Sequence, residues 1–202
     1  DALYSTLLGS DNVSALTIAS FVGRDLVSRR GSGTPIAAFV SEMNNLARSL
    51  RMTKTRFTAP HGLDAGNAVS TSCALDMALL GMYSMQNPAF CYIVSQASRR
   101  IGVQSQTKGT TMYDISNNNK MMSTPGVDGI KAGSSRAAGQ CLLLSATRNA
   151  IARRSPQTGT EVIYPQRMII AVLGTGERYS LARQMLNTGW RVWENWQASG
   201  MD

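Results

Sequence analysis

Histidine, cysteine and aromatic residues are scarce in this sequence of 202 residues. It has one histidine (His61), three widely separated cysteines (Cys73, Cys91 and Cys141) and only 6% aromatic residues. One histidine and cysteines without ligand-like spacing give no basis for a zinc site, and we expect neither a metal nor another cofactor. Three cysteines allow one internal disulfide at most. We expect them to be free and buried, packing as small hydrophobic residues.

Acidic residues are also few, 12 against 20 lysines and arginines, which gives a formal net charge of +8. The basic pairs at 29–30, 99–100 and 153–154 are far apart, and no aromatic-rich binding motif accompanies them. This pattern argues against a nucleic-acid partner. It favours a basic surface that tolerates anionic polymers, and the charge alone does not separate one such polymer from another.

Long apolar stretches are absent, and no run reaches the roughly 20 residues needed to cross a bilayer. The longest runs, such as 168–173, suit a buried strand. The first residues, DALYSTLLGSDN, have no signal-peptide pattern and enter a helical pattern at once, so we expect them to lie inside a larger sequence. A hydrophobic content of 43% is enough for a packed core.

The first half of the sequence has helical spacing of apolar residues. It predicts helices over 12–28 and 35–50, the second capped by Thr34 with Pro35 at its first position. A loop over 57–70 precedes a third helix, capped by Ser70 or Thr71 and continuing through Met85. A shorter helix is predicted from Asn87.

The second half changes to strand-like patterns. A polar hairpin is predicted over 98–116, with its turn near 108–109, then a polar loop over 116–125. Strands are predicted over 127–134, 140–148 and 167–173, the last two joined by a long connection over 152–165, and an amphipathic helix over 181–193 follows. Helices, then antiparallel strands, then a helix indicate an α+β fold. We expect one domain over 1–202, with a helical lobe over 1–97 and the hairpin, strands and closing helix over 98–202.

Two short motifs carry candidate chemistry. Ser10-Asp11-Asn12 immediately precedes a predicted helix, and Lys131-Ala132-Gly133 lies on a predicted strand. Each tripeptide alone is a weak signal. Ser10 and Asn12 could simply cap the helix, and Lys131 could be a solvated strand lysine.

Longer stretches resemble the D-alanyl-D-alanine carboxypeptidases, the low-molecular-mass penicillin-binding proteins. RFTAPHGLDAGNAVSTSCALDMALLG is similar to their Phe-Thr-x-x-His-Gly-Leu-Asp signature, and GVDGIKAGSSRAAGQCLLLSATRN to their Val-Asp-Gly-Ile-Lys-Thr-Gly block. RMIIAVLG and ERYSLARQMLNTGW resemble their last strand and closing helix. The resemblance runs from about Tyr4 to Trp193. It implies part of the penicillin-binding transpeptidase or β-lactamase-like α+β fold, in which His61 and Asp64 belong to a structural turn.

The resemblance also implies roles for the two motifs. In this family the serine of a Ser-x-x-Lys motif attacks the substrate carbonyl, and the Ser-x-Asn motif moves protons and orients the substrate. The Lys-Thr-Gly strand lies beside the substrate and supplies positive potential. Carried over by position, the catalytic residues are Ser10, Asn12 and Lys131, and the substrate-binding residues are Ala132, Gly133, Ser134 and Arg178. Arg178 would hold the substrate carboxylate, although a surface arginine on a helix is the ordinary alternative.

The sequence departs from the family pattern at two points. Position 132 is alanine where the family has threonine, so one hydroxyl is missing unless Ser134 or Ser135 replaces it. The only Ser-x-x-Lys match is Ser105-Gln-Thr-Lys108, in a predicted hairpin where an extended chain does not stack the lysine on the serine. We interpret it as a chance match and expect the nucleophile to lie upstream and this chain alone to be inactive.

The implied function is serine-type removal of the terminal D-alanine from peptidoglycan stem peptides, with β-lactams as inhibitors, outside the cytoplasm in the periplasm or cell envelope. A non-catalytic homologue that binds wall peptides is one alternative. A β-lactamase-like or esterase-like relative is another, disfavoured by the HGLD block. Without upstream strands, the sheet residues Leu142, Leu144, Ile169 and Val172 and the helix bearing Phe21 should lose cover. We therefore expect self-association, or pairing with the N-terminal segment.

Overall fold

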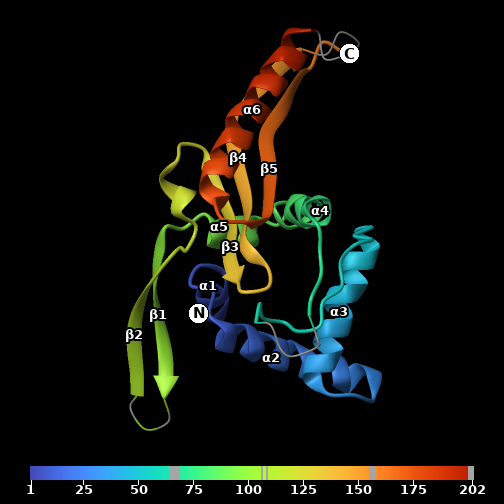
Figure 1. Ribbon diagram of the computed structural model, residues 1–202, viewed down its shortest axis with the longest axis vertical. Helices are drawn as coiled ribbons and strands as arrows, with labels where there is room; N and C mark the ends of the chain where they lie inside the picture. Colours follow the sequence, from blue (N-terminus) through green and yellow to red (C-terminus); the bar gives the residue numbers. More distant parts are fainter. Residues whose placement is uncertain (64–68, 106, 108, 155–157, 200–202) are drawn as a thin grey trace.

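The computed structural model describes residues 1–63, 69–105, 107, 109–154 and 158–199. Helices fill the first half of the chain, and strands followed by one long helix fill the second half (Figure 1). The elements in order are α1 (Ala2–Leu7), α2 (Asn12–Arg30), α3 (Pro35–Ser49), α4 (Ala74–Ser84), α5 (Pro88–Val94), β1 (Ser98–Ser105), β2 (Gly109–Ser116), the 3₁₀ helix η1 (Lys120–Ser123), β3 (Val127–Ser135), β4 (Gly139–Arg154), β5 (Glu161–Thr175) and α6 (Arg178–Ala198). The predicted α+β class is confirmed.

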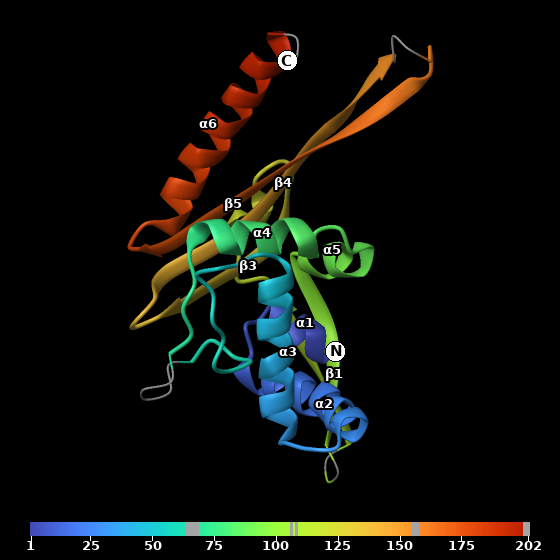
Figure 2. The ribbon, with the colours of Figure 1, turned by 90° about the vertical axis from the view of Figure 1, so that its right-hand side faces the viewer.

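The central sheet has three antiparallel strands in the order β3-β4-β5. Helix α6 covers one face, and α4 and α5 lie on the other (Figure 2). Leu142 and Leu144 are buried in the cluster that contains Trp190 of α6, whereas Leu143 and Ile169 pack in the cluster formed with α4 and α5. This alternation is the period of a strand buried on both faces.

The expectation that the sheet would lose its cover is therefore wrong for the sheet faces. Leu142 and Leu144 are 1% and 0% exposed, and Val172 is buried as well. The reason is that α6 and the α4–α5 pair occupy both faces without help from further strands.

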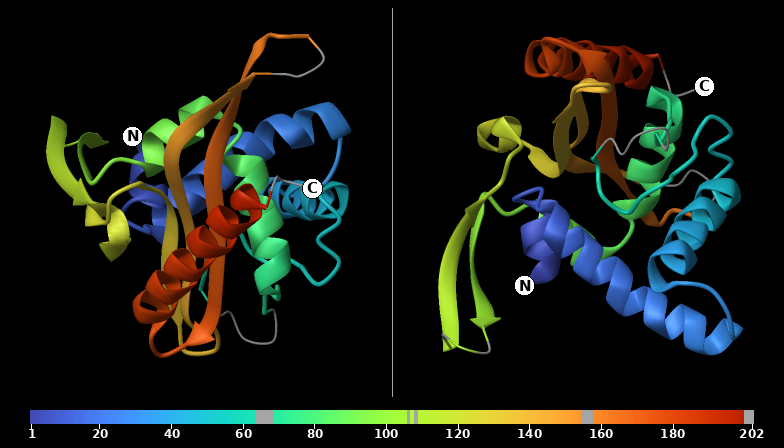
Figure 3. Two further views of the ribbon diagram at one scale, coloured as in Figure 1. Left: turned by 90° about the horizontal axis from the view of Figure 1, so that it is seen from above. Right: turned by 60° about the horizontal axis from the view of Figure 1, so that its bottom comes forward.

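Helix α2 fits the other half of that expectation. Its small residues Ala15, Ala19 and Gly23 are buried, and α2 packs closely against α3. On the rest of the helix Val13 is 70% exposed and Phe21 72% exposed. The right panel of Figure 3 shows α2 extending away from the sheet with α3 at its far end.

The predicted starts of α3 and α5, each with its N-cap, are confirmed. The Thr34 side chain accepts a hydrogen bond from Ala37 N at the start of α3, where Pro35 is the first residue. The Asn87 side chain caps α5 by accepting from Ala89 N and Phe90 N. These caps satisfy amide groups that the first helical turn leaves without partners.

The predicted start of α4 is wrong. The helix begins at Ala74 with Cys73 at the N-cap, not after Ser70 or Thr71. Both predicted residues are engaged elsewhere: Ser70 Oγ accepts from Thr58 N at 3.1 Å, and Thr71 pairs with Arg56 in an isolated β-bridge.

The strands β4 and β5 are longer than the sequence predicted. Most of the expected connection over 152–165 is strand, with Ile151 opposite Tyr164 and Ala152 opposite Ile163. The serine, proline and glycine residues of this stretch predicted a loop. Pairing between β4 and β5 instead extends the ladder well past the core, as far as Arg154 opposite Glu161. The loop over 116–125 likewise contains the 3₁₀ helix η1, stabilised by the Asn119 cap.

The hairpin β1–β2 forms a separate two-stranded sheet beside α1 (Figure 1). Ser105 pairs with Gly109 across the end of the hairpin, and the Ser105 hydroxyl contacts that of Thr107. Ser105 is therefore on extended backbone, as predicted, while Lys108 lies outside the described residues. The three cysteines are free as expected, but half-buried and not fully buried. Among the described helices, none is long and apolar enough to span a membrane.

Candidate functional site

Ser10 lies in the short junction between α1 and α2, which spans residues 8–11. Its backbone is left-handed, with φ of 60°, a conformation that few non-glycine residues adopt. The preceding Gly9 leaves no room for a side chain, because a Cβ atom there would lie 2.9 Å from the Ser5 carbonyl oxygen. Asp11 fixes the other side by accepting a hydrogen bond from Ser14 N at 2.8 Å.

The N-cap of α2 is therefore Asp11, and neither Ser10 nor Asn12. Helix capping was the ordinary explanation for Ser10 and Asn12, and the structure assigns it to the residue between them. The cap also lowers the pKa of the Asp11 carboxyl, chiefly through its hydrogen bonds with Ser14. Ser10 is left with its hydroxyl free to point elsewhere.

That hydroxyl meets Lys131, 121 residues away in the chain. The Lys131 ammonium on β3 donates hydrogen bonds to Ser10 Oγ and, at 2.6 Å, to the Ala132 carbonyl oxygen. Ser10 Oγ in turn lies 3.4 Å from the same carbonyl oxygen. The two motifs singled out in the sequence therefore share one site between the helical part and the sheet.

Lys131 is not a solvated strand lysine. Burial, chiefly, and the positive charge of Arg178 together lower the pKa of its ammonium to about 8. A lysine with a pKa this close to neutral can exist as the free amine and exchange protons with the neighbouring hydroxyl.

Arg178 is the first residue of α6 and reaches across to β3. Its Nη1 donates to the Gly133 carbonyl oxygen at 2.6 Å, and the guanidinium lies 4.8 Å from the centre of the Tyr179 ring. Its Nε is buried and has no hydrogen-bond partner among the described residues. Arg178 is therefore held at the sheet edge, unlike an ordinary surface arginine, with one donor left unused.

The remaining predicted residues are less closely gathered. Asn12 is the first residue of α2 and is half-buried. Ala132 is 3% exposed and its methyl group packs in the α6 cluster, on the strand face opposite Lys131. Ser134 is exposed towards the end of β3, and the Ser135 hydroxyl accepts from Ala138 N at 3.0 Å.

The sequence outside these motifs offered one histidine, His61, and it lies in a turn. His61 Nδ1 accepts a hydrogen bond from Leu63 N at 3.2 Å, which is the turn contact predicted for it, and Asp64 lies outside the described residues. Across the part of the chain that the structure describes, no group of acidic, histidine and cysteine side chains could hold a metal ion.

Sequence reasoning missed one feature of this site. Three consecutive asparagines, Asn117–Asn119, form hydrogen bonds to the segments that carry Ser10, Lys131 and Arg178. A run of three asparagines was visible in the sequence, but an asparagine-rich loop suggests only a turn until its partners are known.

The fold is that of the penicillin-binding proteins. The Streptomyces K15 DD-transpeptidase has the same fold, with a TM-score of 0.76 at 25% identity, over 94% of this chain and 66% of that one. Its S216A mutant gives the same TM-score at 24% identity, covering 94% of this chain and 67% of that one.

Sequence comparison then gives the family. The family model described as D-alanyl-D-alanine carboxypeptidase matches residues 1–155, and the chain belongs to this family. It is 30% identical to the D-alanyl-D-alanine carboxypeptidase DacC of Escherichia coli K12, over 78% of this chain and 34% of DacC. It is 29% identical to DacA of the same strain, over the same shares of the two chains. The chain thus spans about a third of the length of these curated relatives.

The lowered pKa of Lys131 predicts a stability change. In the folded chain the pKa is about 8, whereas an unfolded lysine titrates near 10.4, so the unfolded state binds more protons between these values. Stability from this group therefore rises with pH from about 8 to about 10.4. Lys131→Met should stabilise the chain at pH 7 by about 1–3 kcal/mol, and this gain should shrink above pH 8. Urea unfolding from pH 7 to 10 measures it.

Lys120→Met is the matched control, because Lys120 is exposed. Its unfolding free energy should follow that of the wild type at every pH. A Lys131→Met difference that stays constant from pH 7 to pH 10 would contradict a depressed pKa at this lysine.

Proposed function

We propose that this chain forms the Ser10–Lys131 side of a serine-type D-alanyl-D-alanine carboxypeptidase that removes the terminal D-alanine from peptidoglycan stem peptides. The observation that carries the proposal is the Lys131 ammonium hydrogen-bonded to Ser10 Oγ beside Arg178, in a chain of this family. Such an enzyme works outside the cytoplasm, in the periplasm or cell envelope.

The proposed reaction needs a nucleophilic serine from the part of the enzyme outside these 202 residues. Its hydroxyl gives its proton to the lysine of the same Ser-x-x-Lys motif, its oxygen attacks the carbonyl carbon of the penultimate D-alanine, and the bond from that carbon to the nitrogen of the terminal D-alanine breaks. Ser10 and Lys131 supply the proton that the leaving nitrogen takes up. Water then hydrolyses the acyl ester, which regenerates the serine and releases the shortened peptide.

Arg178 is the proposed partner of the terminal carboxylate. Its guanidinium is anchored next to Gly133, so an arriving carboxylate would gain a charge-assisted hydrogen bond from a group that is already oriented. Asn12 would orient the peptide from the α2 side, and the backbone of residues 132–134 would lie along it. With alanine at position 132, Arg178 bears more of this recognition than it would beside a threonine.

Peptide binding tests this assignment. A peptide ending in D-alanyl-D-alanine should shift the backbone amide NMR signals of Ser10, Lys131 and Gly133. Arg178→Ala should weaken binding about 10-fold or more, because a hydrogen bond to a charged group contributes about 1.5–3 kcal/mol. Arg183→Ala, an exposed arginine of the same helix, is the control and should leave the affinity unchanged.

The same peptide with an amidated C-terminus should bind as weakly to the wild type as the free acid binds to Arg178→Ala. If Arg178→Ala and Arg183→Ala bind the free acid equally well, Arg178 is not the carboxylate partner and the assignment is wrong.

A non-catalytic wall-peptide-binding homologue is the second candidate. Alanine at position 132 favours it, because the family threonine that would contact the carboxylate is missing. The peptide titration does not separate the two candidates, whereas the acylation experiment in the Discussion does.

A further inference from the structure

The loop between β2 and β3 lies against the junction that carries Ser10. Asn118 makes two hydrogen bonds to this junction: its backbone N donates to the Leu8 carbonyl oxygen at 3.0 Å, and its Nδ2 donates to the Gly9 carbonyl oxygen at 2.9 Å. These carbonyl groups follow the last residue of α1 and immediately precede Ser10. They are among the acceptors that a helix end leaves without partners.

The next asparagine contacts the strand that carries Lys131. Asn119 is 1% exposed, and its Nδ2 donates to the Gly129 carbonyl oxygen at 3.2 Å, two residues before Lys131. Its Oδ1 accepts from Met121 N at 3.0 Å and so holds the side chain in place.

The first asparagine anchors the loop itself. Asn117 Nδ2 donates to the carbonyl oxygens of Val94, the last residue of α5, and of Gln96 just beyond it, at 3.1 and 3.0 Å. Its Oδ1 accepts from Asn119 N at 2.9 Å, which ties the Asn117 side chain to the backbone of Asn119.

The same loop also contacts the residue next to Arg178. Tyr179, the residue after Arg178, donates its hydroxyl to the Asn118 carbonyl oxygen at 3.0 Å. Its ring lies under the Arg178 guanidinium. One loop therefore contacts the neighbours of all three residues of the proposed site.

Asparagine suits this task chemically. Its amide has two N–H donors and one acceptor on a short side chain, so it can bind free carbonyl groups on neighbouring segments without bringing a charge into the site. An aspartate of the same shape would place its oxygens against carbonyl oxygens and lose these bonds.

We propose that Asn117–Asn119 are positioning residues that hold Ser10 against Lys131 and set Arg178 beside them. This inference rests on the proposed function, because it assigns these asparagines to the Ser10–Lys131–Arg178 site. Asn118 is the best residue to mutate, because its side chain is exposed and its contact with Gly9 can be removed without opening the core.

The experiment uses the whole chain labelled with [¹³Cε]lysine. The sequence has four lysines, so four signals are expected, and Lys131→Met identifies the one of interest. In the wild type that signal should titrate with a pKa of about 8. In Asn118→Ala, Ser10 should draw away and admit water around the ammonium, which raises this pKa by roughly one unit towards 10.4. The charge of Arg178 opposes this rise only in part.

Asn44→Ala is the matched control. Asn44 also links a loop by its side chain, donating to the Phe57 carbonyl oxygen and accepting from Phe57 N, both at 2.8 Å, away from Ser10 and Lys131. It should lower the stability of the chain and leave the pKa of Lys131 at about 8.

The outcomes separate the claims. A Lys131 pKa that stays near 8 in Asn118→Ala, or that rises equally in Asn44→Ala, overturns the positioning role. A wild-type Lys131 that titrates near 10.4 removes the Ser10–Lys131 site itself, and the proposal falls with it. If the peptide titration fails while Asn118→Ala still raises the pKa, the proposed function is wrong but the positioning role stands.

Discussion

A labelled penicillin is expected to leave the 202-residue chain unmodified. The family's nucleophile motif, Ser-x-x-Lys, occurs in this sequence only at Ser105, at the end of strand β1, and we assign Ser10 and Lys131 to proton transfer and not to nucleophilic attack. Intact-mass spectrometry after prolonged incubation should show no added penicilloyl mass, and Ser105→Ala should behave identically. A full-length carboxypeptidase of the family is the positive control.

Joining the chain to a family segment that carries a Ser-x-x-Lys helix should change this result completely. An adduct should then form on the serine of that segment, and D-alanine should be released from a peptide ending in D-alanyl-D-alanine. Lys131→Met in this joined protein should slow acylation by about 10²–10⁴-fold, the usual contribution of proton transfer by a positioned side chain.

One result would contradict the expectation that the nucleophile lies outside this chain, and another would count against the enzyme assignment. A stable adduct on any serine of the chain alone would mean that a nucleophile was overlooked. A joined protein that folds and binds the peptide but never becomes acylated would favour the non-catalytic wall-peptide-binding homologue.

Local sequence signals predicted much of the fold. The caps at Thr34 and Asn87 mark helix starts because their partners lie within the next three residues. The start of α4 failed for the opposite reason: Ser70 and Thr71 bond to a segment more than ten residues away. The predicted lengths of β4 and β5 were too short for the same reason, because each strand extends as far as it pairs with the other.

The same contrast between local signals and distant contacts applies to the candidate site. The resemblance was enough to name Ser10 and Lys131, although they are 121 residues apart, and the structure brings their side chains together. The part played by Asn118 depends on the free carbonyl groups of Leu8 and Gly9, more than 100 residues earlier. No local pattern encodes that contact, because a loop asparagine has the same sequence signature whether it faces water or the segment between α1 and α2.

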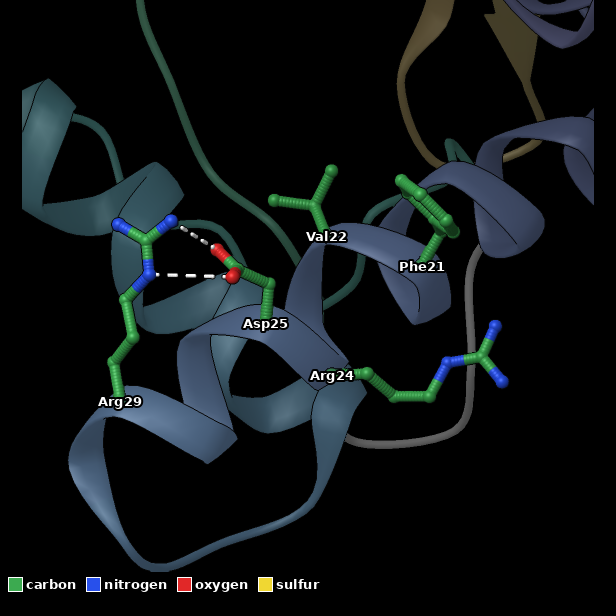
Figure 4. A pocket seen from close by; sticks show the side chains of 5 residues that line it. All are labelled: Phe21, Val22, Arg24, Asp25 and Arg29. Carbon is green, nitrogen blue, oxygen red and sulfur yellow. Dashed lines mark hydrogen bonds and ion pairs between the residues drawn. The ribbon is translucent and has the colours of Figure 1, made fainter.

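The exposed side of α2 leads to the second large effect. Val13, Leu16, Phe21 and Val22 are exposed to between 36% and 72% on a helix that is apolar on most sides. Helices of this kind are normally buried. Figure 4 shows Phe21 and Val22 among the residues that line a pocket, together with the Asp25–Arg29 ion pair.

We propose that this α2 surface mediates self-association of the chain. Covering a few hundred Å² of apolar surface corresponds to about 5–10 kcal/mol at ~25 cal/mol per Å², which is comparable to the stability of a domain. Sedimentation velocity from low to high micromolar concentration should therefore show the average mass rising with concentration. In the joined protein described above, the added segment should compete for this surface and leave a monomer.

Phe21→Asp should abolish this association, because a charge at the centre of the contact would have to lose its water. It should leave the unfolding free energy of the monomer nearly unchanged, since Phe21 is 72% exposed in the chain. Val192→Asp, at a position on α6 that is 60% exposed, is the control and should associate as the wild type does. A wild-type chain that sediments as a monomer across the whole concentration range, with a cooperative melt and no binding of a hydrophobic dye, would show that the α2 surface needs no partner.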